Sequence, residues 1–218
     1  MGIWKIVAIV ALLGVLLGYG IYENKPPAPI VGGPNQPLPT GPAPADNTKA
    51  WIGKPAIAWN IAPNYWMNTG GKALQLKDTL GKVTLVEFFR IDCPHCQEAA
   101  PEMVQIYNML GPRGLNIVAI QAPGSAADES DWGNVQSTIK EWHVTYPVAF
   151  DEGSQEFKKY GFSMYPTVMI LDKQGIVRFA QSGFDKKDKR KNLLDALNKL
   201  MGLGGPGGVS LQPIAAAK

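Results

Sequence analysis

The feature that most limits how this chain can fold is an apolar run, VTLVEFFRI at residues 83–91, that leads into the motif CPHC at residues 93–96. The run is typical of a buried β-strand, and residues 93–110 have the pattern of a helix that Pro101 should kink. The two cysteines of the motif are the only ones in the chain, which excludes a framework of structural disulfides. The sequence therefore places a pair of thiols at the start of a helix.

Residues 50–201 alternate strand-like and helix-like segments, which is typical of an α/β domain. We expect strands at 116–121, 146–150, 167–171 and 176–180, helices at 134–142, 154–160 and 186–201, and a small N-terminal hairpin extension within 51–80. With 218 residues and 45% hydrophobic content, the chain can bury one full-sized core. A net charge of only +3 argues against nucleic acid as a partner.

The N-terminal residues predict a segment that enters a membrane. Residues 6–21 carry no charge, and aromatic residues flank them as they flank membrane helices. We expect residues 1–25 to be an uncleaved anchor that contacts the membrane through residues 3–22. A cleaved signal peptide is the alternative, because it also has a basic start and a short apolar run. The positive charge before the run predicts that the N-terminus stays in the cytoplasm and that the rest of the chain is exported.

Two further segments have compositions that oppose folding. Residues 26–49 form a Pro-rich linker, with eight prolines between residues 26 and 44, and are expected to be an extended tether. Residues 202–218 are rich in glycine and are expected to be a disordered tail. The predicted domain is therefore held away from the bilayer.

The position of the two cysteines suggests dithiol chemistry. A cysteine reacts as a thiolate, and a helix N-terminus favours the thiolate of Cys93 through its dipole and free amides. Cys96 lies close enough to attack a mixed disulfide formed at Cys93 and so release the partner. Pro94 and His95 tune this equilibrium, Pro94 by limiting the loop and His95 by stabilising the thiolate.

Other uses of the cysteine pair fit the sequence less well. A zinc site usually needs four ligands, and the two thiols could be joined only by His95 and His143, so we expect no metal. An inert structural disulfide is disfavoured because so small a ring is strained and exposed. No Gly-rich phosphate loop follows a strand, so we expect no cofactor besides the redox-active disulfide Cys93–Cys96.

The residues 85–96, then Pro101, then Tyr165-Pro166-Thr167 before a strand, together resemble the thioredoxin superfamily. The anchor, the linker and an insertion before the second motif resemble the TlpA/ResA group of extracytoplasmic thiol-disulfide oxidoreductases. The resemblance covers about residues 50–200 and implies a thioredoxin fold, a central mixed β-sheet flanked by helices.

The resemblance also implies roles for three residues. Pro166 would be a cis-proline facing the cysteines, and Tyr165 would offer backbone hydrogen bonds to an extended substrate. Glu87 would correspond to the buried acid that moves protons to and from the resolving cysteine, and burial would raise its pKa. The alternative for Glu87 is a carboxylate at a strand edge that reaches solvent.

The implied activity is thiol-disulfide exchange with cysteine-containing exported proteins, including apocytochromes, on the outer side of the inner membrane. A membrane or soluble thiol protein would be the redox partner. The TlpA/ResA-like layout slightly favours a reductant of the cytochrome c maturation type, whereas Pro94-His95 resembles the oxidant DsbA. Two other classes are a redox-silent client-binding module and a peroxiredoxin, although Arg90 stands where a peroxiredoxin has threonine.

Overall fold

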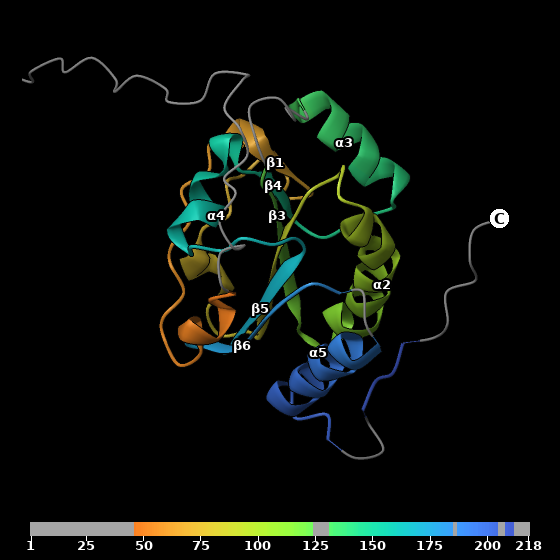
Figure 1. Cartoon of the computed structure of the whole chain (residues 1–218). Helices are drawn as coiled ribbons and strands as arrows, with labels where there is room; N and C mark the ends of the chain where they lie inside the picture. The colour runs from red at the N-terminus through yellow and green to blue at the C-terminus, as the bar shows by residue number, and fades with distance from the viewer. Residues whose placement is uncertain (1–45, 124–130, 185–186, 205–207, 212–218) are drawn as a thin grey trace, which may run out of the picture. The chain divides into compact units, whose positions relative to one another are not determined.

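A computed structural model of the chain describes residues 46–123, 131–184, 187–204 and 208–211 (Figure 1). The predicted anchor at 3–22 and the linker up to residue 45 lie outside the described residues. Within the described ranges, no helix is both long and apolar enough to cross a membrane.

A mixed six-stranded sheet forms the centre of the domain, in the order β1-β4-β3-β2-β5-β6. Strand β2 runs parallel to β3, which runs parallel to β4, whereas β5 is antiparallel to both β2 and β6. The strands are β1 (Trp66–Met67), β2 (Thr84–Phe89), β3 (Asn116–Gln121), β4 (Val148–Phe150), β5 (Thr167–Leu171) and β6 (Val177–Ser182). This arrangement confirms the thioredoxin-like α/β fold expected from the sequence.

Helices cover both faces of the sheet (Figure 1). The α-helices are α2 (Pro94–Leu110), α3 (Trp132–Glu141), α4 (Gln155–Lys159) and α5 (Lys187–Leu200). The 3-10 helices are η1 (Thr48–Trp51), η2 (Pro63–Tyr65), η3 (Leu76–Thr79), η4 (Gly111–Arg113) and η6 (Glu152–Ser154). Every strand and α-helix expected after residue 80 is present, with ends within two residues of the prediction.

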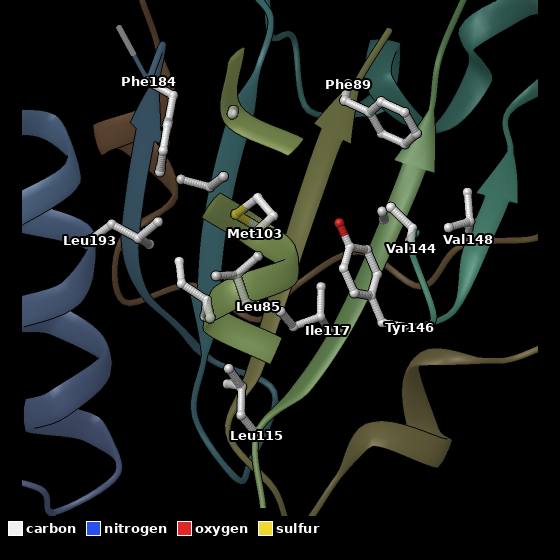
Figure 2. Close-up of a cluster of buried hydrophobic side chains, with 14 of the residues drawn as sticks. Leu85, Phe89, Met103, Leu115, Ile117, Val144, Tyr146, Val148, Phe184 and Leu193 are labelled. Carbon is white, nitrogen blue, oxygen red and sulfur yellow. The ribbon is translucent and has the colours of Figure 1, made fainter. Parts of the chain in front are cut away.

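The alternation of side chains along β2 divides the core into two clusters. Leu85 and Phe89 face α2, where they pack with Met103 in the first cluster, which Figure 2 shows in close-up. Val86 and Phe88 face the other side and join the second cluster. Because successive residues of a strand point to opposite faces, Glu87 shares the α2 face with Leu85 and Phe89.

The predicted hairpin at 51–80 is wrong. That segment contains 3-10 turns and the single short strand β1, which pairs with β4 rather than with a neighbouring strand. Two of its tryptophans are buried and hydrogen-bonded instead: Trp59 donates its indole N–H to the carbonyl of Leu74 at 2.6 Å, and Trp66 donates to that of Ile61 at 3.2 Å. The apolar residues of this segment therefore fill the second cluster from a loop.

The described residues 208–211, which belong to the predicted tail, contact the domain. The backbone of Val209 exchanges two hydrogen bonds with the side-chain amide of Asn198 on α5, at 3.0 and 3.1 Å. Val209 and Leu211 also pack against the first cluster.

Candidate active site

The two cysteines occupy the first turn of α2. Cys93 is the N-cap, with extended backbone angles, and Pro94 is the first helical residue, where its missing N–H costs nothing. The carbonyl of Cys93 accepts hydrogen bonds from the amides of Cys96 and Gln97, both at 3.0 Å. Both cysteines are free thiols; Cys93 is partly exposed, whereas Cys96 is only 1% exposed. One sulfur can therefore be reached from outside and the other cannot.

The surroundings of the two sulfurs differ as their exposure does. The Cys93 Sγ lies 3.9 Å from the carbonyl oxygen of Tyr165, and the Cys96 Sγ accepts a hydrogen bond from the backbone amide of Arg90 at 3.5 Å. Burial raises the pKa of the Cys96 thiol far above its ordinary value, and the charges of Glu87 and Cys93 add to the increase. Cys96 therefore needs a base before it can attack a disulfide.

The Tyr165–Pro166 peptide bond is cis, as the resemblance implied, and it faces Cys93 from the loop before β5. The Tyr165 ring stacks on Phe157 with ring centroids 4.3 Å apart. The carbonyl of Pro166 accepts a hydrogen bond from the amide of Gly183 at 2.7 Å. Neighbouring Met164 is 44% exposed, so an apolar side chain borders the loop on its outer side. The substrate-binding role of Tyr165 and Pro166 stays a prediction.

Glu87 lies in the middle of β2, where its register partners are Ala119 of β3 and Val168 of β5. It is 4% exposed, so the alternative of a carboxylate at a strand edge is wrong. Burial raises the pKa of Glu87 from 4.5 to about 8. A carboxyl group that titrates near neutral pH can both accept and return a proton.

Glu87 and Cys96 line the same small cavity, of about 10 Å³, beneath the first turns of α2. The cavity is bounded by Glu87, Phe89, Cys96, Ala100, Ala119, Ile139, Trp142, Val144 and Tyr146. A space of this size is at the lower limit for one water molecule. The structure thus brings the predicted base and the predicted resolving thiol together.

The outer rim of the site carries charged residues. His95 is exposed, and its Nδ1 lies 3.4 Å from an Oε2 of Glu98. Arg90 donates from Nε to Asp92 at 2.9 Å, and its guanidinium lies 5.8 Å from the centre of the Tyr165 ring. The hydrogen bond from Arg90, acting against partial burial, lowers the pKa of Asp92. The rim therefore joins the start of α2 to the cis-proline loop.

Sequence reasoning did not identify Arg90 and Asp92 as parts of the site, nor Tyr146 as a residue of its cavity. Their position just before Cys93 in the sequence was the available signal for the first two. Tyr146 gave no such signal, because an aromatic residue next to a strand is ordinary core. In the part of the chain that the structure describes, no three histidine, cysteine, aspartate or glutamate side chains gather to form a metal site.

Comparisons with known proteins show which family and which folds the chain resembles. The family model described as AhpC/TSA family matches residues 52–180. The thiol-disulfide oxidoreductase ResA of Bacillus thuringiensis subsp. konkukian is 31% identical over 134 residues, which are 61% of this chain and 74% of that protein.

Two solved structures resemble the domain. One, from Chlorobium tepidum and assigned as the thiol:disulfide interchange protein DsbE, has a TM-score of 0.60 at 22% identity and covers 69% of this chain and 98% of its own. The other is a thiol-disulfide isomerase from Corynebacterium glutamicum, with a TM-score of 0.56 at 25% identity, covering 67% of this chain and 96% of its own. At 22% identity, the Chlorobium tepidum structure bears on the fold alone.

Proposed function

The chain belongs to the AhpC/TSA family as a ResA-like member of the thioredoxin superfamily, and on that premise we propose that Cys93 and Cys96 exchange disulfides with other proteins. One observation carries this proposal: a partly exposed sulfur at a helix tip lies 3.9 Å from the cis-proline loop, with a second sulfur buried one turn inside. The enzyme class is thiol-disulfide oxidoreductase.

The exchange has two steps, and each of them is reversible. In the reducing direction, the Cys93 thiolate attacks a substrate disulfide; a bond forms between Cys93 and one substrate sulfur, and the other substrate sulfur leaves as a thiolate. The thiol proton of Cys96 then passes to the Glu87 carboxylate. The Cys96 thiolate attacks Cys93, so that the Cys93–Cys96 bond forms and the second substrate thiolate is released. The substrate gains two electrons and the enzyme loses two.

The carbonyl of Tyr165 would orient the bound substrate relative to Cys93. It faces the Cys93 sulfur, so an extended substrate chain that binds along this loop would present its own sulfur at the helix tip. The exposed Met164 next to the loop offers apolar contact to such a chain.

Insulin reduction by the full chain tests this function. Cys93→Ala should abolish the activity, and Cys96→Ala should accumulate a mixed disulfide between Cys93 and the substrate that is visible by mass spectrometry. Glu141→Gln is the matched control, because its side chain is exposed at the end of α3 and has no place in the site, so it should leave the rate unchanged. If Cys93→Ala still reduced insulin, a redox-silent binding module would be the better description.

We propose that the physiological direction is reduction of exported proteins, of the kind needed before haem attachment to apocytochromes. The support is the TlpA/ResA-like layout, and Pro94-His95 is the observation that favours the oxidant instead. The reduction potential of the Cys93–Cys96 pair, measured against glutathione, separates the two. A value near thioredoxin's, about −270 mV, indicates a reductant, and one near about −120 mV indicates an oxidant.

We also propose that the domain acts outside the cytoplasm, tethered to the inner membrane by residues 3–22, and is recharged by a membrane or soluble thiol partner. The uncharged run at residues 6–21 supports this location. Recovery of full-length mass in the membrane fraction would indicate an uncleaved anchor. A mass short of the N-terminal residues, in the soluble exported fraction, would indicate a cleaved signal peptide.

A further inference from the structure

The residues that line the cavity beside Cys96 include one polar side chain that the exchange reaction described above does not use, that of Tyr146. Tyr146 is 2% exposed and lies just before β4, on the face of the sheet that carries Glu87. Figure 2 shows its ring among the buried side chains, with the hydroxyl directed toward the end of the sheet at which Phe89 lies. A buried phenol is expected to find a hydrogen-bond partner.

The sheet register explains why Glu87 and Tyr146 meet across this space. Ala119 pairs with Glu87 on one side and with Val148 of β4 on the other. The side chain of Ala119 is only a methyl group, so it leaves space above β3 between the two neighbouring strands. Ala100 of α2, which lines the cavity from the helix side, is equally small. Larger residues at these two positions would fill the space between Glu87 and Tyr146.

The Tyr146 ring is held in place from two directions. The side-chain amide of Asn68 donates to the carbonyls of Val144 and Tyr146, at 3.0 and 2.9 Å, and so fixes the backbone before β4. Tyr107 of α2 meets the Tyr146 ring edge-on, with centroids 5.4 Å apart. The hydroxyl is therefore presented to the cavity by a rigid frame.

The groups that face Glu87 leave few ways to stabilise its charged form. The cavity is lined by nine residues, of which the titratable ones are Glu87 from β2, Cys96 from α2 and Tyr146 before β4. Helix α3 and the residues after it contribute Ile139, Trp142 and Val144, and β5 places Val168 beside Glu87. None of the nine is basic, so within this cavity the charged form of Glu87 can be stabilised only by a hydrogen-bond donor and not by a cation.

We propose that Tyr146 is a positioning residue for proton transfer: its hydroxyl donates to one water molecule in the cavity, and that water donates to the Glu87 carboxylate. The proposal rests on the proposed function, because it assigns the residue that supports the base of the resolving step. Burial and then the nearby Glu87 charge raise the pKa of Tyr146 well above 10, so the phenol remains a donor throughout the working range. A cavity of this size with polar groups on several sides meets the requirement for one bound water.

The test follows the attack of Cys96 as a function of pH. Reduced full-length protein is mixed with Ellman's reagent; the first nitrothiobenzoate is released when Cys93 reacts, and the second when Cys96 displaces it. Tyr146→Phe should shift the midpoint of the second release upward by about one pH unit, because a hydrogen bond to a charged group is lost. The midpoint belongs to the coupled Glu87–Cys96 pair rather than to either group alone.

Matched variants make the result specific. Tyr107→Phe removes a hydroxyl from the neighbouring ring outside the cavity and should leave the midpoint unchanged. Glu87→Gln should remove the dependence, and adding Tyr146→Phe to it should change nothing further. The infrared band of the protonated Glu87 carboxyl, identified by its loss in Glu87→Gln, reports the same titration without any reaction. The midpoint pH of this infrared titration should also be higher in Tyr146→Phe.

The outcomes separate this inference from the proposed function. If Glu87→Gln alters the profile but Tyr146→Phe leaves both the kinetic midpoint and the infrared titration unchanged, the role of Tyr146 is refuted and the exchange mechanism stands. The role of Tyr146 is also refuted if Tyr146→Phe shifts the midpoint equally in the Glu87→Gln background. If neither Glu87→Gln nor Cys96→Ala affects the second release, both proposals fail together.

Discussion

The burial of Glu87 predicts that replacing it by glutamine makes the protein more stable at neutral and alkaline pH. The folded chain holds this carboxyl group at a pKa of about 8, against 4.5 for an ordinary glutamate. Between these two values the folded protein keeps a proton that the unfolded chain releases, so the stability of the wild-type protein falls as the pH rises. Glutamine has the shape of the protonated acid and never ionises, so it escapes this loss.

The size of the effect follows from the two pKa values. Their difference, at about 1.4 kcal/mol for each pH unit, amounts to about 5 kcal/mol. The advantage of Glu87→Gln should therefore be small near pH 5, grow by about 1.4 kcal/mol per pH unit, and level off above about pH 8. A gain of this order is a large fraction of the 5–15 kcal/mol that typically stabilises a domain.

Urea unfolding of the reduced proteins at pH 5, 6, 7 and 8 measures this advantage. In this range the thiols contribute equally to both chains, so the difference in unfolding free energy isolates residue 87. Glu141→Gln, whose side chain is exposed at the end of α3, is the matched control and should give a flat difference. A flat difference for Glu87→Gln, or one that falls with pH, would refute the placement of Glu87 as a buried neutral acid.

Three smaller predictions test the frame around the site. Met103→Ala should lower the unfolding free energy measured in urea by about 2–5 kcal/mol, because the Met103 side chain is fully buried in the first cluster. The control Met164→Ala, at an exposed position, should lower it by less than about 0.5 kcal/mol, and equal losses would contradict this packing. Asn68→Gly keeps the left-handed backbone, at φ 60°, but leaves two carbonyls unpaired, and should lower the unfolding free energy by about 1–3 kcal/mol; no loss would mean that these bonds do not hold the segment. Arg90→Ala should raise the pKa of Asp92 toward 3.8 in an NMR titration, and an unchanged pKa would show that the ion pair does not form in solution.

The parts of this molecule that sequence predicted well depend on local patterns. The strand at β2, the helix that starts at the cysteines and the strand at β5 each have their signals within a few residues, and each lies where it was expected. Glu87 was identified through the resemblance, which assigns a buried acid to the position six residues before Cys93. The resemblance then added the cis bond before Pro166, which no local pattern indicates.

The failed predictions depend on contacts between distant segments. The segment 51–80 was expected to form a hairpin with itself, but its neighbour in the sheet is β4, which follows much later in the chain. The relation of Glu87 to Tyr146 depends on the small size of Ala119, which belongs to the strand between them. A single sequence contains these residues without showing that they are neighbours.

The difference in exposure between the two sulfurs accounts for the position of the buried acid. A partner protein can reach Cys93, but only the interior of the domain reaches Cys96, so the proton of Cys96 must be received inside. A carboxylate with an ordinary pKa would remain ionised and would accept that proton poorly, whereas burial brings the pKa of Glu87 to about 8 and allows transfer in both directions. The same burial lowers stability as the pH rises, so the substitution that stabilises the fold should be the one that slows the exchange. Measuring unfolding and nitrothiobenzoate release on the same Glu87→Gln protein tests both consequences, and a variant that gained stability without losing the resolving step would separate them.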